Sequence, residues 1–247
     1  GIGDIQSPDI TLDEIFAYLS QADKPCLIAI DEFQTIAGYP EKTVEATLRK
    51  RIQNCHNANF IFSGSKRHMM ALMFTSKSRP FYHSSSIMGL EAISEPTYLE
   101  FANHHLSKIS REISAEAFSY LYHRFDGITW YIQYVLNMLY TSISDSRVLG
   151  KEDVEYCIES ILSQHRFAYQ ALLFQLTSKQ KQVLIAIARE GSPSSLMSQE
   201  FLHKYRLGAS TVQGAVKTLL ERDFITQDEG VYQLCDKFLE LSLKEEI

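Results

Sequence analysis

The chain has 247 residues, enough for two or three small domains with more than one hydrophobic core. Hydrophobic residues make up 45% of it, and no apolar run reaches the roughly 18–20 residues that span a bilayer, so the sequence predicts no membrane protein. The formal net charge of −6 argues against binding of nucleic acid through the charge of the whole chain. The four cysteines (26, 55, 157 and 235) lack metal-ligand spacing, which predicts reduced thiols and a cytoplasmic location.

The first third of the chain predicts part of a parallel α/β sheet. Thr11-Leu12-Asp13-Glu14 has the capping-box pattern, so a helix is expected over 11–21. Apolar runs at 26–30 and 59–62 predict two buried strands, and the polar stretch 41–54 between them predicts a helix. The order helix, strand, helix, strand is typical of a parallel sheet. The chain starts at Gly1 without Met or a signal peptide, and we expect it to be processed or cut from something longer.

The rest of the chain predicts helices and then a hairpin. Pro96 suits a helix start, and no strand signal interrupts the helices that follow. Two short strands around the turn Asp228-Glu229-Gly230 then follow three further helices, which is the order of a winged helix-turn-helix. The expected domains are an α/β core over 1–95, a helical domain over 96–176 and a winged helix over 177–247. The helices are expected at 96–106, 114–125, 130–142, 152–163, 166–176, 178–190, 198–205 and 209–222.

The most informative motif is the apolar strand 27–30 followed by Asp31 and Glu32. Such a strand presents two carboxylates at its carboxyl end, where open α/β sheets bind ligands, and this is the Walker B pattern of ATPases. Asp31 is the expected Mg²⁺ ligand, and Glu32 is expected to polarise the attacking water. The alternative interpretation is a strand that ends in a solvated acidic turn.

A second strand ends about thirty residues later in Ser63-Gly64-Ser65, in the place where P-loop ATPases carry a polar residue that senses the γ-phosphate. With these motifs in order, the chain resembles the archaeal-type ATPase family, a branch of the AAA+/STAND P-loop proteins. The matching segments cover nearly the whole chain: Ile30-Asp31-Glu32-Phe33-Gln34, Phe62-Ser63-Gly64-Ser65, Met73-Phe74, Arg79-Pro80-Phe81-Tyr82, Gly127-Ile128-Thr129-Trp130-Tyr131-Ile132-Gln133 and Tyr232-Gln233-Leu234-Cys235-Asp236-Lys237-Phe238.

The resemblance implies an ATP-dependent molecular switch that uses ATP and Mg²⁺. In that reading Glu32 and Ser63 are catalytic, and Asp31, Ser65 and Gly127 contact the nucleotide or its metal ion. The nucleotide of such relatives lies between the α/β core and a helical lid, and the winged helix reports its state. The resemblance also leaves room for a protein client and for an oligomer.

Three departures from the family qualify this expectation. No GxxxxGK[ST] loop, which cradles the phosphates, occurs in the chain, so we expect it to bind nucleotide poorly or not at all unless an upstream segment supplies that loop. The strand of that loop is expected between the two strands found here, so its absence predicts a gap in the sheet. His83-Ser84 replaces the expected Gly-Arg, which leaves Arg67 and Arg79 as alternative arginine fingers or structural arginines.

In the third departure, relatives have Gly-x-Pro in the lid where this chain has Gly127-Ile128-Thr129, so Gly127 is either a nucleotide contact or the C-cap of a helix. The eight histidines show no zinc spacing, which favours structural or surface roles. The aromatic stretch 130–136 resembles a stacking surface, but its helical spacing favours core packing.

The winged helix offers a different function. Ser210, Thr211, Gln213 and Lys217 have the spacing of a recognition helix that reads a major groove. Residues 177–247 contain nine Lys and Arg and ten Asp and Glu, a net charge of about −1, whereas DNA-binding domains carry a positive excess. The alternatives are therefore a non-enzymatic DNA-binding regulator, a protein-docking winged helix, and a degenerate ATPase that binds nucleotide without turnover.

Overall fold

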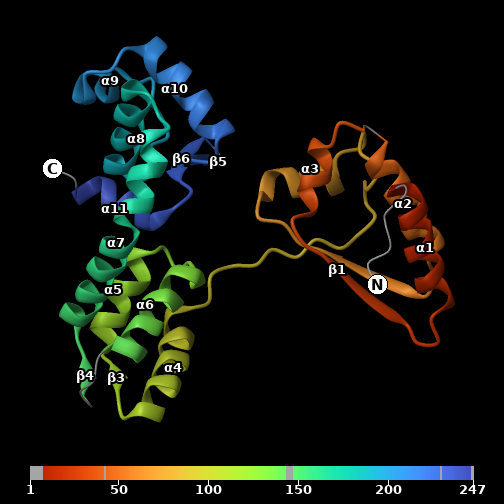
Figure 1. Ribbon diagram of the computed structural model, residues 1–247, viewed down its shortest axis with the longest axis horizontal. Helices are drawn as coiled ribbons and strands as arrows, with labels where there is room; N and C mark the ends of the chain where they lie inside the picture. The colour runs from red at the N-terminus through yellow and green to blue at the C-terminus, as the bar shows by residue number, and fades with distance from the viewer. Residues whose placement is uncertain (1–7, 42, 143–146, 229, 246–247) are drawn as a thin grey trace. The chain divides into compact units, whose positions relative to one another are not determined.

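The computed structural model describes residues 8–41, 43–142, 147–228 and 230–245. The chain forms two compact units, which we call the α/β unit, ending at Gly89, and the helical unit, beginning at Leu90 (Figure 1). Among the described residues, no helix is both long and apolar enough to cross a membrane. Glu229, in the predicted hairpin turn, lies outside the described residues.

Two short parallel strands form the sheet of the α/β unit. Strand β1 (Cys26–Ile30) pairs with β2 (Ala58–Phe62), and the register sets Cys26 opposite Ala58. The two strands hydrogen-bond to each other directly, so the predicted gap between them is wrong. A further strand would have to join this sheet at an outer edge. The other elements of the unit are α1 (Pro8–Gln21), the 3₁₀ helix η1 (Phe33–Gly38), α2 (Val44–Asn54) and α3 (Arg67–Thr75).

The sheet has one covered face and one bare face. Phe60 stacks on Phe16 of α1 at 5.9 Å, and Phe62 lies 4.3 Å from the ring of Phe33. On the opposite face Leu27 is 68% exposed and Ile61 is 51% exposed. The prediction of two buried strands is therefore wrong for this face, since no described element of the unit covers it.

The helical unit begins with a bundle in which α5 and α6 pack against the long helix α7. Ser114 caps α5 by accepting a hydrogen bond from the Ala117 amide. The prediction of a domain without strands is wrong at one place. The two-residue strands β3 (Glu112–Ile113) and β4 (Val148–Leu149) pair in parallel. The bundle consists of α4 (Glu95–Leu106), η2 (Ser107–Ile109), β3 (Glu112–Ile113), α5 (Ala115–Arg124), α6 (Thr129–Ser142), β4 (Val148–Leu149) and α7 (Lys151–Phe174).

The prediction of two helices at 152–163 and 166–176 is wrong, because one helix, α7, spans both segments. The intervening Gln164 and His165 are polar, but neither breaks a helix, and no Gly or Pro occurs between Lys151 and Phe174. The helix therefore continues through both segments (Figure 1).

The last part of the helical unit has the predicted order of three helices and an antiparallel hairpin. Thr177 and Gln180 form a capping box that starts α8. Strand β5 pairs antiparallel with β6, with Ile225 opposite Leu234, and an additional helix, α11, follows the hairpin. The elements are α8 (Ser178–Glu190), α9 (Gln199–Tyr205), α10 (Ala209–Glu221), β5 (Ile225–Asp228), β6 (Val231–Leu234) and α11 (Lys237–Glu245).

The two units have hydrophobic cores of very different size. One continuous buried cluster runs through the helical unit, from Tyr98 in α4 to Leu243 in α11. The buried cluster of the α/β unit contains Phe33, Met73, Phe74 and Phe81, with half-buried residues around it. The bundle and the winged helix therefore share one core, whereas the α/β unit depends on a few aromatic side chains.

Candidate functional site: the carboxyl ends of the two parallel strands

The predicted catalytic residues lie together at the carboxyl ends of β1 and β2. The Ser63 amide donates to the Ile30 carbonyl at 3.0 Å, and the Phe33 amide donates to the Ser63 carbonyl at 2.9 Å. These bonds extend the pairing beyond the strands, so the segment that contains Asp31 and Glu32 lies beside Ser63-Gly64-Ser65. The structure thus places the two motifs side by side.

Asp31 and Ser63 form the first polar pair of the site. The Ser63 hydroxyl donates to Asp31 Oδ1 at 2.6 Å, and the Glu32 amide donates to the same oxygen at 2.9 Å. These two bonds hold the pKa of the Asp31 carboxyl below its ordinary value, and the Ser63 bond has the larger effect. Asp31 is exposed and ionised at neutral pH, which suits a ligand of a divalent cation.

Glu32 and Ser65 form the second pair. The Ser65 hydroxyl donates to Glu32 Oε2 at 3.1 Å, and the Gln34 side-chain amide donates to the same oxygen. Glu32 has a left-handed backbone (φ 49°, ψ 38°) at the N-cap of η1, a conformation that costs a non-glycine residue on the order of 1 kcal/mol. The chain thus turns sharply after Asp31, and two donors fix the Glu32 carboxylate.

Gln34 is a site residue to which the sequence analysis gave no role. Its side chain is 2% exposed, and its Oε1 atom accepts no hydrogen bond from any described residue. Gly64 makes room for it, because a Cβ atom on Gly64 would lie 2.0 Å from Gln34 Oε1 and 2.7 Å from Met70 Sδ. The sequence contains one signal for this contact. A glutamine lies two residues after Glu32, and a glycine lies between the two serines that follow the second strand.

Of the two alternative arginine fingers, Arg79 and Arg67, the structure describes only the side chain of Arg79. Arg79 Nη2 lies 2.9 Å from Oε1 of Glu45, a carboxylate with only 8% side-chain exposure. This ion pair gives Arg79 a structural role inside the α/β unit. The side chain of Arg67 lies outside what the structure describes.

Gly127 belongs to the helical unit, in the turn between α5 and α6. Its φ is +70°, and its amide donates to the Tyr122 carbonyl at 2.9 Å. A Cβ atom there would lie 2.8 Å from the Tyr122 hydroxyl. This geometry is the one expected of a glycine that ends a helix, and it accounts for Gly127 without a nucleotide.

The predicted DNA-reading residues share a face of α10. Ser210, Gln213 and Lys217 are exposed and Thr211 is half-buried, while Val212, Ala215, Val216 and Leu219 bury the opposite face. Lys217 Nζ lies 3.9 Å from Glu221 Oε1, so the charge of Lys217 is partly offset within the helix. In the described part of the chain, no three His, Cys, Asp or Glu side chains converge as a metal-binding group.

Comparison with known proteins adds independent findings. Residues 167–245 match the family described as a probable winged helix domain. The Walker-type ATPase of Pyrococcus abyssi has a similar structure, with a TM-score of 0.61 and 16% identity over 96% of this chain and 68% of the other. The RuvB Holliday junction branch migration motor of Thermotoga maritima matches at 16% identity over 95% and 75%, with a TM-score of 0.47. A comparison with curated proteins gave no match.

The fold of the Pyrococcus abyssi protein agrees with the resemblance that the motifs indicate. At 16% identity the likeness to the Pyrococcus abyssi protein concerns the fold, and it extends over both units of the chain. The winged helix match covers the region in which three helices and a hairpin were predicted. The chain therefore has the fold of a Walker-type ATPase with a winged helix domain near its carboxyl end.

Proposed function

We propose that this chain supplies the Walker B and sensor part of an ATP-binding site in an ATP-dependent molecular switch. The observation that carries the proposal is the double pairing of Asp31 with Ser63 and of Glu32 with Ser65 at one edge of a parallel sheet. Ligands of open α/β sheets bind at this edge. A solvated acidic turn, the alternative interpretation, does not require the second strand to present two hydroxyls to the two carboxylates.

Each side chain has a role in this proposal. Asp31, with one oxygen held by Ser63, binds Mg²⁺, which when bound offsets the charge of the β- and γ-phosphates. Glu32 orients the attacking water, and its bonds from Ser65 and Gln34 set the direction of its carboxylate. Ser63 and Ser65 face the γ-phosphate.

The phosphate-binding loop must come from a segment that this sequence does not contain. The bare sheet face supports this part of the proposal, because parallel sheets occur almost only with both faces covered. Leu27 and Ile61, which are more than half exposed, fit contact with a further helix, and an outer strand edge remains for a further strand. Without that segment the chain is expected to bind ATP poorly or not at all.

The domains of the proposed switch are an α/β core over 1–95, a lid over 96–176 and a winged helix over 177–247. In this proposal ATP and Mg²⁺ bind at the core, the winged helix contacts a protein client or DNA, and the complete protein forms oligomers. A cytoplasmic location stays a prediction.

Calorimetry with ATP, ADP and Mg²⁺ tests the proposal, using this chain and the same chain joined to a segment that carries the phosphate-binding loop. We expect binding only by the extended protein, and we expect Asp31→Ala to weaken it. The matched control is Asp13→Ala, an exposed carboxylate on α1 that pairs with Arg51. If the extended protein binds no nucleotide, the proposal is wrong; binding without release of phosphate would instead identify a degenerate ATPase.

A second candidate function rests on the exposed face of α10. Ser210, Gln213 and Lys217 lie on one side of a helix in the place of a recognition helix. DNA binding predicts affinity for duplex DNA that falls with salt and with Lys217→Ala, whereas Lys179→Ala on α8 should have little effect. Salt-independent or undetectable binding would favour a protein-docking winged helix.

A further inference from the structure

A phenylalanine of the winged helix is buried among aromatic side chains of the bundle. Phe238, at the start of α11, is 1% exposed. Its ring centroid lies 5.1 Å from that of Phe125 after α5, and 5.2 Å and 5.7 Å from those of Tyr131 and Tyr134 on α6. His165 of α7 lies parallel to it at 6.4 Å. An element that follows the hairpin in sequence thus completes the core of the preceding domain.

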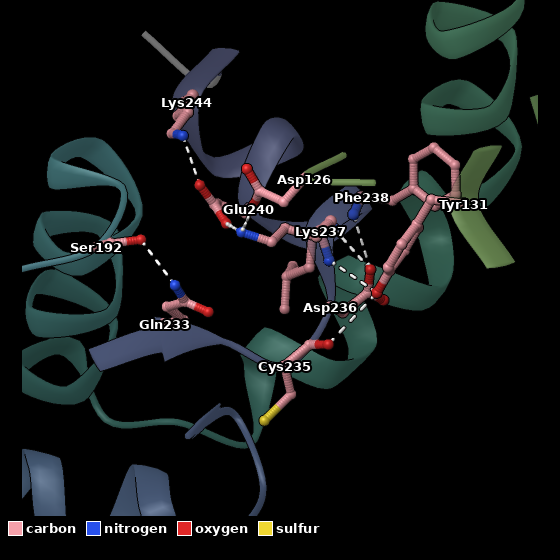
Figure 2. A network of polar contacts seen from close by, with 11 residues as sticks. Asp126, Tyr131, Ser192, Gln233, Cys235, Asp236, Lys237, Phe238, Glu240 and Lys244 are labelled. Atoms are coloured by element: carbon pink, nitrogen blue, oxygen red, sulfur yellow. Dashed lines mark hydrogen bonds and ion pairs between the residues drawn. The ribbon is translucent and has the colours of Figure 1, made fainter. Parts of the chain in front are cut away.

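Hydrogen bonds surround this aromatic contact. The Tyr131 hydroxyl accepts from the Lys237 amide at 3.0 Å and donates to the Cys235 carbonyl at 3.3 Å (Figure 2). The Tyr169 hydroxyl of α7 donates to Asp236 Oδ2 at 3.1 Å. The other Asp236 oxygen accepts from the Phe238 amide at 2.8 Å, which caps α11. Two bundle tyrosines therefore hold the backbone and the cap at the start of α11.

A buried ammonium group connects the same helix to the turn that contains Gly127. Lys237 Nζ lies 2.8 Å from Asp126 Oδ2 and 3.2 Å from Glu240 Oε2 (Figure 2). Burial lowers the pKa of Lys237, but the hydrogen bond from Lys237 to Asp126 and the charge of Glu240 outweigh it, so its pKa lies above the ordinary value. Asp126 directly precedes Gly127, and its own backbone is left-handed at φ 52°. Lys237 thus fixes this turn from the side of the winged helix.

We propose that these contacts lock the winged helix to the bundle, so that the two domains move as one rigid body. We call the contacts the α11 joint, defined by Asp126, Tyr131, Tyr169, Asp236, Lys237 and Phe238. Helix α7 supports the joint, since it buries Cys157 and Ile161 in the bundle and presents Tyr169 to Asp236. Buried contacts of this density favour discrete arrangements over continuous deformation.

The inference goes beyond the proposed function and does not depend on it. A switch whose winged helix swings freely needs a flexible connection to its lid, and the joint removes that freedom. The recognition face of α10 and the Gly127 turn would change position together, so the winged helix reports the movement of the whole helical unit. A ligand at either place then acts on one shared equilibrium.

Residual dipolar couplings of backbone amides in the weakly aligned 247-residue chain test the joint without any nucleotide. Couplings from α4–α6 and from α8–α10 are fitted separately to the structure. We expect the same alignment axes and the same magnitude for both sets. Different axes or magnitudes in the unmodified chain would overturn the proposal.

Variants then test whether the joint causes the coupling. In Phe238→Ala we expect the common alignment to be lost, with a smaller magnitude for the winged helix. The matched control Phe201→Ala removes the same side chain from the winged helix core, where its ring partner is Tyr205 of the same helix, and should keep one alignment. If Phe238→Ala does not fold, Tyr131→Phe combined with Lys237→Met keeps the volume and removes the polar contacts. If the folded variant keeps one common alignment, contacts other than the α11 joint hold the two domains together and the proposal is wrong.

Discussion

The α/β unit and the helical unit differ in how completely they bury their own apolar surface. The helical unit has a continuous core from Tyr98 to Leu243, and its winged helix contributes Phe238 to the bundle. The α/β unit holds the paired carboxylates and hydroxyls but leaves Leu27 and Ile61 on an uncovered sheet face. The residues that we propose for chemistry therefore lie in the unit with an uncovered sheet face, and the contacts that we propose to couple two domains lie in the unit with the continuous core.

The largest difference between the two units is expected when one aromatic ring is removed from each core. Phe33→Ala should destabilise the α/β unit by roughly 3–5 kcal/mol, because Phe33 contacts Phe62, Phe74 and Phe81 and few other residues are buried there. The matched change Phe118→Ala should cost the bundle a similar free energy without unfolding it. Amide hydrogen exchange measures both. Equal loss of protection in the two units would contradict the comparison.

A smaller effect is expected at the contact between Gly64 and Gln34. Gly64→Ala places a methyl group against a buried amide and Met70, and should cost about 1–3 kcal/mol. Gly38→Ala, whose added methyl group meets no atom within 4 Å, should change stability by less than about 1 kcal/mol. Urea unfolding of both variants measures whether the site is tightly packed, although one face of its sheet is uncovered. Equal stability of the two variants would argue against a close fit of Gln34.

Two buried cysteines, one in each unit, test the comparison without mutation. Cys55 is 4% exposed in the α/β unit, and Cys157 is fully buried in the bundle. Burial raises the pKa of Cys157 to about 11. We expect alkylation of the native chain to modify Cys55 well before Cys157, because local opening is easier in the unit with the smaller core. Alkylation in urea supplies the control, where both should react alike; earlier modification of Cys157 in the native chain would refute the expectation.

The smallest expected effect is electrostatic and lies at the exposed edge of the sheet. The pKa of Asp31 is lowered in the folded chain, so its stabilising contribution is present above the ordinary pKa and is lost as the pH falls through the lowered value. Ser63→Ala should raise the pKa of Asp31, while Ser65→Ala, which affects Glu32, should leave it unchanged. Carboxyl NMR titration measures this. An unchanged Asp31 pKa in Ser63→Ala would mean that the hydroxyl does not hold the carboxylate in solution.

Local patterns predicted much of the fold. Apolar runs located β1 and β2, the helix expected at 178–190 has the bounds of α8, and the hairpin was placed correctly. The contact between Asp31 and Ser63 was not predicted, although parallel strands place their carboxyl ends at one edge of a sheet. Helix α11 was missed, although Asp236 caps it, because its apolar residues follow a hairpin that seemed to end the domain.

What the sequence did not predict depends on contacts between distant residues. The exposure of Leu27 depends on which other segments cover the sheet. A run of apolar residues has the same sequence pattern whether its strand is covered or exposed. The role of Gln34 follows from the missing side chain of Gly64, thirty residues away. A further strand was expected between β1 and β2, whereas the register shows that these two strands pair directly. The burial of Phe238 depends on Tyr131, which lies more than one hundred positions away in the sequence.

The left-handed backbone of Glu32 has a consequence for the selection of variants of this protein. Glycine adopts that conformation without strain, so Glu32→Gly would relieve backbone strain and at the same time remove the carboxylate held by Ser65 and Gln34. In the proposed function this substitution would also abolish turnover, because no carboxylate would orient the attacking water. Glycine at position 32 would thus separate the strain of the folded backbone from the proposed chemistry.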